Sequence, residues 1–128
     1  MDVLAVGIAG IVGAWCRYLI SLAANPVGAA EFPWGTLACN LAGCLFLGYL
    51  GRAAFLKWSP RLQLAINTGF IGSFTTFSTF SVETVELFRG GEIGMAIAYV
   101  LLSLWGGLGL AWAGFALAKR KEGMKRDA

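Results

Sequence analysis

The chain has 128 residues, of which 58% are hydrophobic and only 13% are charged, and its formal net charge is +3. A soluble domain of this size usually carries about 25% charged residues, so this composition cannot cover a water-facing surface. The mean hydropathy of +0.71 therefore predicts one small integral membrane domain. Histidine is absent, and without it or a buried lysine no nucleophile–base pair can be built, so we expect no enzyme. The basic residues flank apolar segments, which favours a lipid bilayer rather than a nucleic acid as their partner.

The first predicted span covers residues 3–24 and is interrupted only by Arg17. A cleaved signal peptide is the alternative, but Asp2 stands where a basic region belongs and Arg17 interrupts the apolar region. We therefore expect a spanning helix, with Arg17 reaching for the nearer interface. Three cysteines fall in the predicted spans without CxxC spacing, which predicts packing roles rather than a metal site or disulfides; they are Cys16, Cys39 and Cys44.

The second predicted span covers residues 33–56 and contains the motif GTLACN at 35–40. Thr36 and Asn40 are four residues apart and therefore share one helical face. Asn40 lies about 10 Å into the span at 1.5 Å per residue. Its amide could bond to a neighbouring helix or could face a pathway through the membrane, and the sequence leaves both interpretations open.

The third predicted span covers residues 60–88, where TGFIGSFTTFSTFS at 68–81 alternates hydroxyls with phenylalanines. Glycines and hydroxyl side chains compete with helical hydrogen bonds, which predicts a broken helix around residues 72–76. Broken backbone is tolerated in a membrane only where protein, water or an ion satisfies it. Freed carbonyls suit a cation, whereas freed N–H groups and hydroxyls suit an anion. Phe77 and Phe80 share a face, and their positive ring edges could flank an anion.

The fourth predicted span covers residues 92–119, and residues 119–128 form a polar basic tail. Tyr99 and Ser103 give this span one polar face, while Glu83 near the end of the third span is either a solvated boundary or a titratable mouth. Neutral donors suit fast passage of an anion, because a pore must bind its ion weakly enough to release it. Composition does not say which anion.

Charge is distributed unevenly between the two sides of the four predicted spans. Arg89 lies on one side, with Arg17 if it reaches that way, and eight basic residues lie on the other, which predicts both termini in the cytoplasm. The eight are Arg52, Lys57, Arg61, Lys119, Arg120, Lys121, Lys125 and Arg126.

The motifs GTLACN and GFIGSFTTFSTFSVET, together with four short spans, resemble the bacterial Fluc/CrcB fluoride channels over nearly the whole chain. The resemblance implies an all-α integral membrane fold with one domain over residues 1–128 and a third helix broken in mid-membrane. It also implies an antiparallel, dual-topology homodimer with two pores in the bacterial plasma membrane. Such a channel would passively release cytoplasmic fluoride.

The same resemblance assigns roles to particular residues. Asn40 would donate to fluoride near the pore vestibule, and Phe77 and Phe80 would line the pore. The backbone carbonyls of Gly72 and Thr75, from both subunits, would surround a central structural sodium ion. A hydroxyl-rich polar track would follow, with Tyr99 and Ser103 of the fourth span as further pore residues; the track consists of Thr36, Ser78, Thr79, Ser81 and Glu83.

Two features depart from the family pattern. Gly107 stands where many relatives carry a serine, for which Ser103 could partly substitute. Basic residues divide eight against two, whereas dual topology usually needs a balance, so an oppositely oriented paralogue is an alternative partner to a second copy. Two alternative functions are a small proton-coupled exporter, in which Glu83 would be the carboxylate, and a membrane scaffold without transport.

Overall fold

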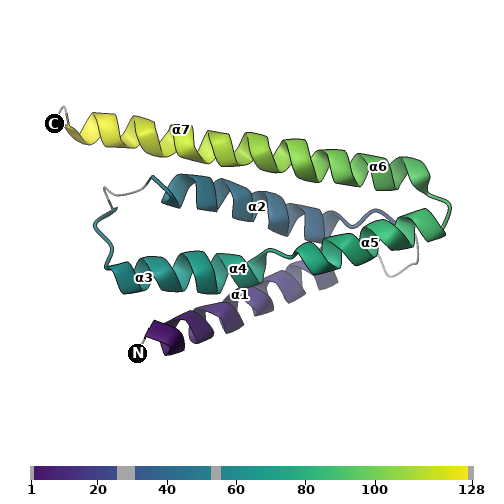
Figure 1. Ribbon diagram of the computed structural model, residues 1–128, viewed down its shortest axis with the longest axis horizontal. Coiled ribbons are helices and arrows are strands. Elements are labelled where there is room, and N and C mark those ends of the chain that lie inside the picture. The colour runs from purple at the N-terminus through teal and green to yellow at the C-terminus, as the bar shows by residue number, and fades with distance from the viewer. Residues whose placement is uncertain (1, 26–30, 53–55, 127–128) are drawn as a thin grey trace.

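The computed structural model describes residues 2–25, 31–52 and 56–126, and within these ranges it contains helices and no strands. Helices α3, η2 and α4 follow one another as one rod, and so do α6, η3 and α7 (Figure 1). In chain order the elements are α1 (Asp2–Ala24), α2 (Trp34–Leu50), α3 (Pro60–Leu64), the π-helix η2 (Ala65–Ile71), α4 (Gly72–Phe74), α5 (Phe77–Arg89), α6 (Ile93–Leu101), the π-helix η3 (Leu102–Gly106) and α7 (Gly107–Arg126).

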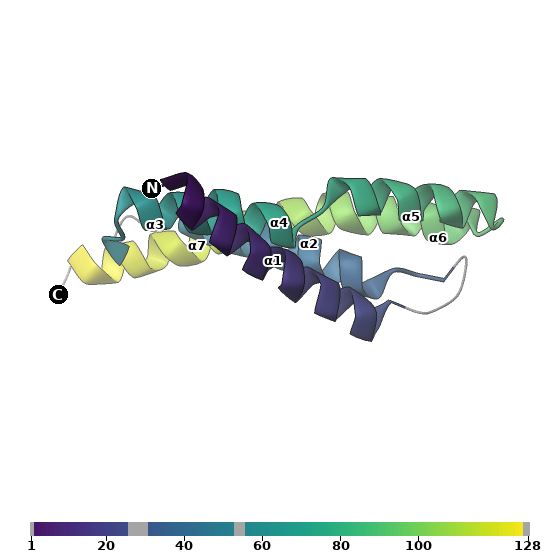
Figure 2. The same cartoon turned by 90° about the horizontal axis from the view of Figure 1, so that it is seen from below.

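The rod of α6, η3 and α7 runs the length of the molecule, and both chain ends lie at the same end of it (Figure 1). Helix α2 packs chiefly on α7, and α1 packs chiefly on η2. Viewed from below, α5 lies beside α6 and the end of α1 diverges from them (Figure 2). The molecule is therefore a thin helical layer rather than a closed bundle.

Close backbone contact holds α2 against α7. A Cβ added to Gly48 would collide with the backbone of Ala111, and one added to Gly114 would collide with the backbone of Leu45. Small residues let helices approach this closely in lipid, where dispersion contacts rather than the hydrophobic effect hold helices together.

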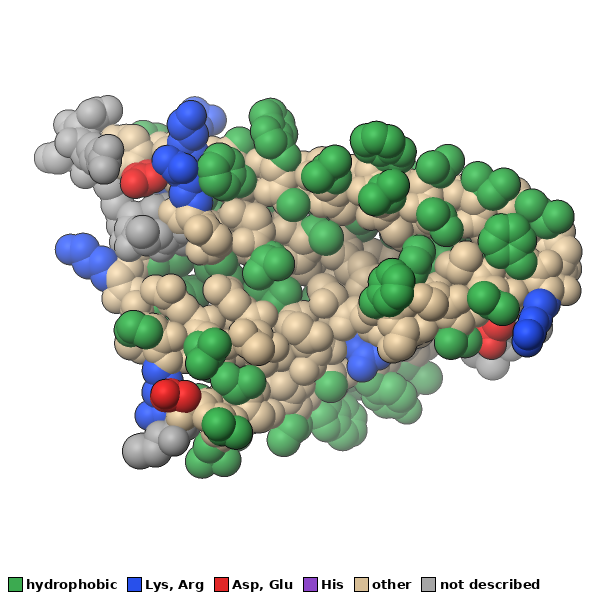
Figure 3. Space-filling model, viewed as in Figure 1, with side chains coloured by type: hydrophobic (Ala, Val, Ile, Leu, Met, Phe, Trp, Pro, Cys, Tyr) green, Lys and Arg blue, Asp and Glu red, His purple; other side chains and the backbone are tan. Residues whose placement is uncertain are grey.

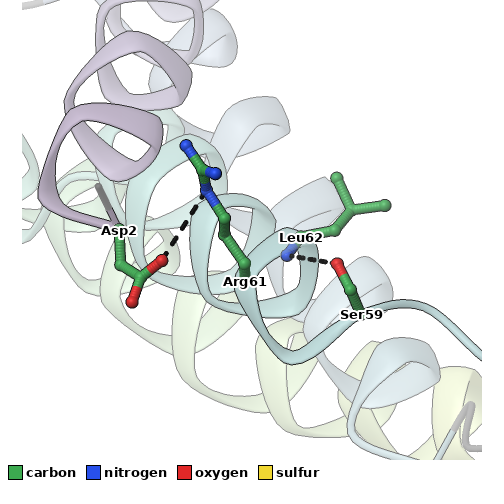
Figure 4. A network of polar contacts seen from close by, with 4 residues as sticks. All are labelled: Asp2, Ser59, Arg61 and Leu62. Atoms are coloured by element: carbon green, nitrogen blue, oxygen red, sulfur yellow. Dashed lines mark hydrogen bonds and ion pairs between the residues drawn. The ribbon is translucent and has the colours of Figure 1, made fainter.

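The start of α3 is fixed by local chemistry. Ser59 caps the helix by accepting a hydrogen bond from the Leu62 N–H at 3.3 Å (Figure 4). Pro60 occupies the first turn, where it loses no helical hydrogen bond. Arg61 Nε lies 3.6 Å from Asp2 Oδ1 in an exposed ion pair between the starts of α3 and α1 (Figure 4).

Two extended residues separate α4 from α5. Thr75 has φ −88° and ψ 157°, and Thr76 has φ −150° and ψ 124°. Thr76 Oγ1 accepts the Thr79 N–H at 3.1 Å and so caps α5. The helical break therefore lies within the region 72–76 where glycines and hydroxyls weaken the helix.

The buried core lies between α2, α5 and α6, where Leu37, Leu87, Ala96 and Tyr99 pack together. A tight turn joins α5 to α6, and Gly91 adopts φ +84° there, a conformation that favours glycine. Elsewhere, large apolar side chains cover much of the visible surface, while most charged side chains lie near the two ends (Figure 3). An apolar surface of this extent indicates contact with lipid or with another chain.

Two of the described helical stretches, Asp2–Ala24 and Ile93–Met124, are long and apolar enough to cross a membrane. Helix α2 has 17 residues and ends at Leu50, short of residue 56 where the second span was expected to end. The third segment is interrupted at Thr75 and Thr76, so neither of its halves reaches the roughly 20 residues of a full span. The depth of the break in a membrane remains a prediction.

Candidate functional site

Glu83 lies at the centre of a polar cluster formed by α2, α5 and α6. Its Oε1 accepts hydrogen bonds from the Thr36 hydroxyl at 2.7 Å and from the Asn25 amide at 3.1 Å. Its Oε2 accepts one from the Tyr99 hydroxyl at 2.7 Å. Thr36 and Tyr99 are fully buried. The carboxylate is thus surrounded by neutral donors rather than exposed at a solvated boundary, and we call Asn25, Thr36, Glu83 and Tyr99 the Glu83 cluster.

Asn25, which follows the last residue of α1, is a site residue that the sequence did not predict. It is 11 residues from Thr36 and 58 from Glu83 in sequence. No helical or strand spacing relates such positions, so periodicity could not have found it. Its position next to Pro26 marked only the end of a helix.

A second polar group surrounds the break. Asn40 Nδ2 donates to the Thr76 carbonyl at 3.0 Å, and Asn40 Oδ1 accepts the Thr76 N–H at 2.8 Å. This pair of bonds takes the place of the helical bonds that Thr76 has lost. The Asn40 amide has two N–H groups, and within the described part of the chain only the one bonded to Thr76 has a partner.

Hydroxyl groups at the start of α5 bond mostly to one another. Thr76 Oγ1 lies 3.2 Å from Ser78 Oγ and 3.0 Å from Thr79 Oγ1. Ser81 differs, because its hydroxyl donates back to the Phe77 carbonyl of its own helix at 2.8 Å. The predicted polar track is therefore divided: Thr36 and Glu83 belong to one cluster, Ser78 and Thr79 to the break, and Ser81 bonds within its helix.

At the break, the carbonyls of Gly72 and Thr75 lack the N–H donors that they would have in a continuous helix. In a continuous helix the Thr76 N–H would bond to the Gly72 carbonyl and the Thr79 N–H to the Thr75 carbonyl. Here those N–H groups bond to the Asn40 and Thr76 side chains. The carbonyls predicted to hold sodium are thus released from their helical donors.

Arg17 of α1 bonds to the last turn before the break. Its Nε donates to the Ser73 carbonyl at 3.0 Å. Ser73 is half-buried, and a charged donor makes a stronger hydrogen bond to its carbonyl than a neutral one would. This contact supports a structural role for Arg17.

A cavity of about 470 Å³ lies beside the break, and its lining includes Asn40, Phe77, Phe80 and Ser103. The Phe77 and Phe80 ring centroids are 5.8 Å apart, and Phe80 lies 5.0 Å from the ring of Tyr99. These aromatic rings connect the cavity to the Glu83 cluster. The Ser103 hydroxyl is buried and has no hydrogen-bond partner within the described residues.

Gly107 does not contribute to this cavity lining. It is buried one turn beyond Ser103, and a Cβ added there would lie 3.3 Å from the sulfur of Cys44. Ser103 stands in η3, and π-helical turns often occur at functional sites because they re-aim side chains.

The cavity can bind a small anion without trapping it. It offers an amide N–H, a hydroxyl and positive ring edges, and among the described residues its lining includes no lysine, arginine or carboxylate. Within the described ranges, no three His, Cys, Asp or Glu side chains lie close enough to hold a metal ion. Any cation at the break would therefore depend on carbonyl oxygens.

Within the described residues the fold is all-helical, with two stretches long and apolar enough to cross a membrane and a small, uncharged polar cavity beside a helical break. The family model described as CrcB-like protein, Camphor Resistance (CrcB), matches residues 4–115, and the chain belongs to this family. The chain is 47% identical to Fluoride-specific ion channel FluC 2 of Geobacillus kaustophilus (strain HTA426), over 97% of this chain and 99% of that protein. It is 49% identical to FluC 1 of Desulfitobacterium hafniense (strain Y51), over 86% and 96%. It is 43% identical to FluC of Chlorobium phaeobacteroides (strain BS1), over 91% of each. The resemblance drawn from the motifs is thereby confirmed.

Proposed function

We propose that this chain is a passive fluoride channel that lets cytoplasmic fluoride leave the cell. The single observation behind this is the cavity in which an unpaired Asn40 N–H, the Ser103 hydroxyl and the rings of Phe77 and Phe80 meet. Fluoride is small and strongly hydrated, and such a site can replace part of its water shell. Because no full positive charge lines the cavity, the ion is free to move on.

The channel would work as an antiparallel dimer of four-span subunits in the bacterial plasma membrane. Phe77 is 80% exposed in one copy although it borders the cavity. An exposed ring at a pore wall is expected to be covered by a second subunit. A second copy and an oppositely oriented paralogue both fit, and the homodimer is the simpler assembly.

A sodium ion would bind at the centre of this dimer. Gly72 and Thr75 carbonyls have lost their helical donors in each copy, and carbonyl oxygens suit a hard monovalent cation. Two copies together would supply four such oxygens. The ion would fix the two breaks relative to each other.

The proposed function is tested by loading purified protein into vesicles and measuring fluoride and chloride efflux. We expect fast fluoride efflux and little chloride efflux. Flux must not depend on an imposed pH gradient, because a channel is not coupled to protons. Coupled flux would favour an exporter, and no ion flux from folded protein would favour a scaffold.

The role of the rings is tested with Phe77→Ile and Phe80→Ile. Isoleucine keeps an apolar surface but lacks the positive ring edge, so we expect each variant to abolish fluoride efflux while the dimer survives on size exclusion. Phe46→Ile is the matched control, because Phe46 is an exposed ring on α2 outside the cavity lining. Normal efflux in both pore variants would overturn the pore assignment.

A further inference from the structure

The side-chain amide of Asn25 connects the end of α1 with α2 and α5. Its Oδ1 accepts the backbone N–H groups of Gly35 at 2.7 Å and Thr36 at 3.3 Å. Its Nδ2 donates to Thr36 Oγ1 at 3.2 Å and to Glu83 Oε1 at 3.1 Å. One small side chain therefore contacts both the first turn of α2 and the carboxylate of α5.

The orientation of this amide is set by its partners. Backbone N–H groups can only donate, so the atom facing Gly35 and Thr36 must be the oxygen. The nitrogen then faces the carboxylate, which can accept. Both the oxygen and the nitrogen of the amide are hydrogen-bonded, the oxygen to backbone N–H groups of α2 and the nitrogen to side chains of α2 and α5.

The oxygen caps α2. Pro33 stands at the N-cap position and makes no side-chain cap bond, so the first N–H groups of α2 need an acceptor from elsewhere. Asn25 Oδ1 supplies it. A carboxylate oxygen at this position would cap at least as well, because a negative charge is favourable at a helix N-terminus.

The nitrogen acts on Glu83. Together with the hydroxyls of Thr36 and Tyr99 it places donors on both oxygens of the carboxylate. Donors on both oxygens offset the charge and fix the carboxylate beside Tyr99, whose ring packs on Phe80 at the cavity. A carboxylate released from this position would repel an anion in the cavity.

We propose that Asn25 is a positioning residue of the pore, which holds the Glu83 carboxylate against Thr36 and Tyr99 and so keeps its charge away from the permeating anion. This role rests on the proposed channel function. It is distinct from capping, since capping needs only the oxygen of Asn25 and positioning needs its nitrogen.

The titratable groups bonded within the Glu83 cluster are Glu83 on α5 and Tyr99 on α6, while α2 contributes the neutral Thr36. Replacing Asn25 by aspartate keeps the capping oxygen but places a second carboxylate beside the first. Two neighbouring carboxylates repel each other until one takes up a proton. Fluoride flux through the Asn25→Asp variant should therefore depend on pH.

The experiment compares fluoride efflux from vesicles for the wild type, Asn25→Asp, Glu83→Gln and the double variant Asn25→Asp/Glu83→Gln, from neutral to mildly acid pH. Protein-free vesicles correct for HF, which crosses bilayers unaided. We expect Asn25→Asp to lose about tenfold in flux at neutral pH, the size of one hydrogen bond to a charged group. Its flux should recover as the pH falls. The double variant has one carboxylate and one amide again, so its pH profile should return to that of the wild type.

Asn67→Asp is the matched control, because it introduces the same change in η2, away from the Glu83 cluster. Asn25→Asp with the flux and pH profile of the wild type would show that Asn25 only caps α2 and would overturn the proposal. If Asn25→Asp does not fold, the double variant must fold and conduct; its failure would also overturn the proposal. Absence of fluoride flux in the wild type would instead refute the channel itself.

Discussion

At the scale of single residues, the polar side chains differ in how much of their hydrogen-bonding capacity is used. Both oxygens of Glu83 have donors, whereas the buried Ser103 hydroxyl has no partner in the described part of the chain. An unsatisfied buried hydroxyl costs about 1–3 kcal/mol. A protein is expected to tolerate this free-energy cost at a cavity wall if the unpaired hydroxyl donates a hydrogen bond to a permeating ion.

Ser103→Ala tests this interpretation. Removing the unpaired hydroxyl should raise the free energy of unfolding by about 1 kcal/mol, while fluoride efflux should fall because the ion loses a donor. Both quantities can be measured on the same purified protein, by denaturant unfolding in detergent and by vesicle efflux. Ser81→Ala is the control, since the Ser81 hydroxyl bonds within its own helix. Unchanged efflux in Ser103→Ala would remove Ser103 from the pore.

Several individual residues could be singled out from the sequence, but their partners could not. The spacing of Thr36 and Asn40 correctly placed both on α2, yet the structure gives them to different clusters. Asn25 was missed because its bonds depend on how the ends of α1, α2 and α5 meet in space. Local sequence patterns contain no information about such a meeting point.

At the scale of elements, the break between α4 and α5 depends on side chains from two helices. Glycines and hydroxyls predicted a weak point over residues 72–76, because they weaken the helix locally. The exact residues, Thr75 and Thr76, follow from the Thr76 cap and from the bonds to Asn40. The early end of α2 at Leu50 was not predicted, because an apolar run shows where a helix can continue and not where it stops.

Thr76→Ala should destabilise the start of α5. Loss of an N-cap side chain costs about 1 kcal/mol, and we expect a decrease of that size in the free energy of unfolding. Fluoride efflux should also fall, because Phe77 is the first residue of α5 and its position depends on the start of this helix. Thr76→Ser should retain both properties, since serine also caps. Thr84→Ala is a matched control, because the Thr84 hydroxyl bonds back to the Phe80 carbonyl. Equal stability of Thr76→Ala and the wild type would contradict the capping role.

At the scale of the whole molecule, charge and exposure point to assembly in a membrane. Lys and Arg side chains gather near both ends of the molecule (Figure 3). The C-terminal end of α7 lies at the end that holds both termini, whereas α5, whose last residue is Arg89, ends at the other (Figure 1). Arg52 pairs with Glu122 at 3.3 Å and lies over the Phe115 ring at 5.0 Å, so part of this charge is engaged within the subunit. A basic residue paired within the subunit, such as Arg52, is expected to influence the orientation of membrane insertion less than an unpaired basic residue in a loop.

The orientation can be measured with a cysteine added at the C-terminus. The three native cysteines lie in α1 and α2, two of them half-buried and one buried, where a membrane-impermeant thiol reagent should not reach them. An antiparallel homodimer predicts that about half of the added cysteines are labelled from outside intact vesicles, since each dimer contains both orientations. Labelling of all or none would instead favour a single orientation and an oppositely oriented paralogue as partner.

The two bonds between Asn40 and the Thr76 backbone have one more consequence. The Asn40 amide donates to the C=O and accepts from the N–H of the same residue, Thr76, as two paired residues do in an antiparallel β-ladder. Both bonds form within a single chain, so each subunit would fix the conformation of its helical break during its own folding, before it dimerises. A subunit inserted in either orientation would then have the same break geometry when the dimer forms.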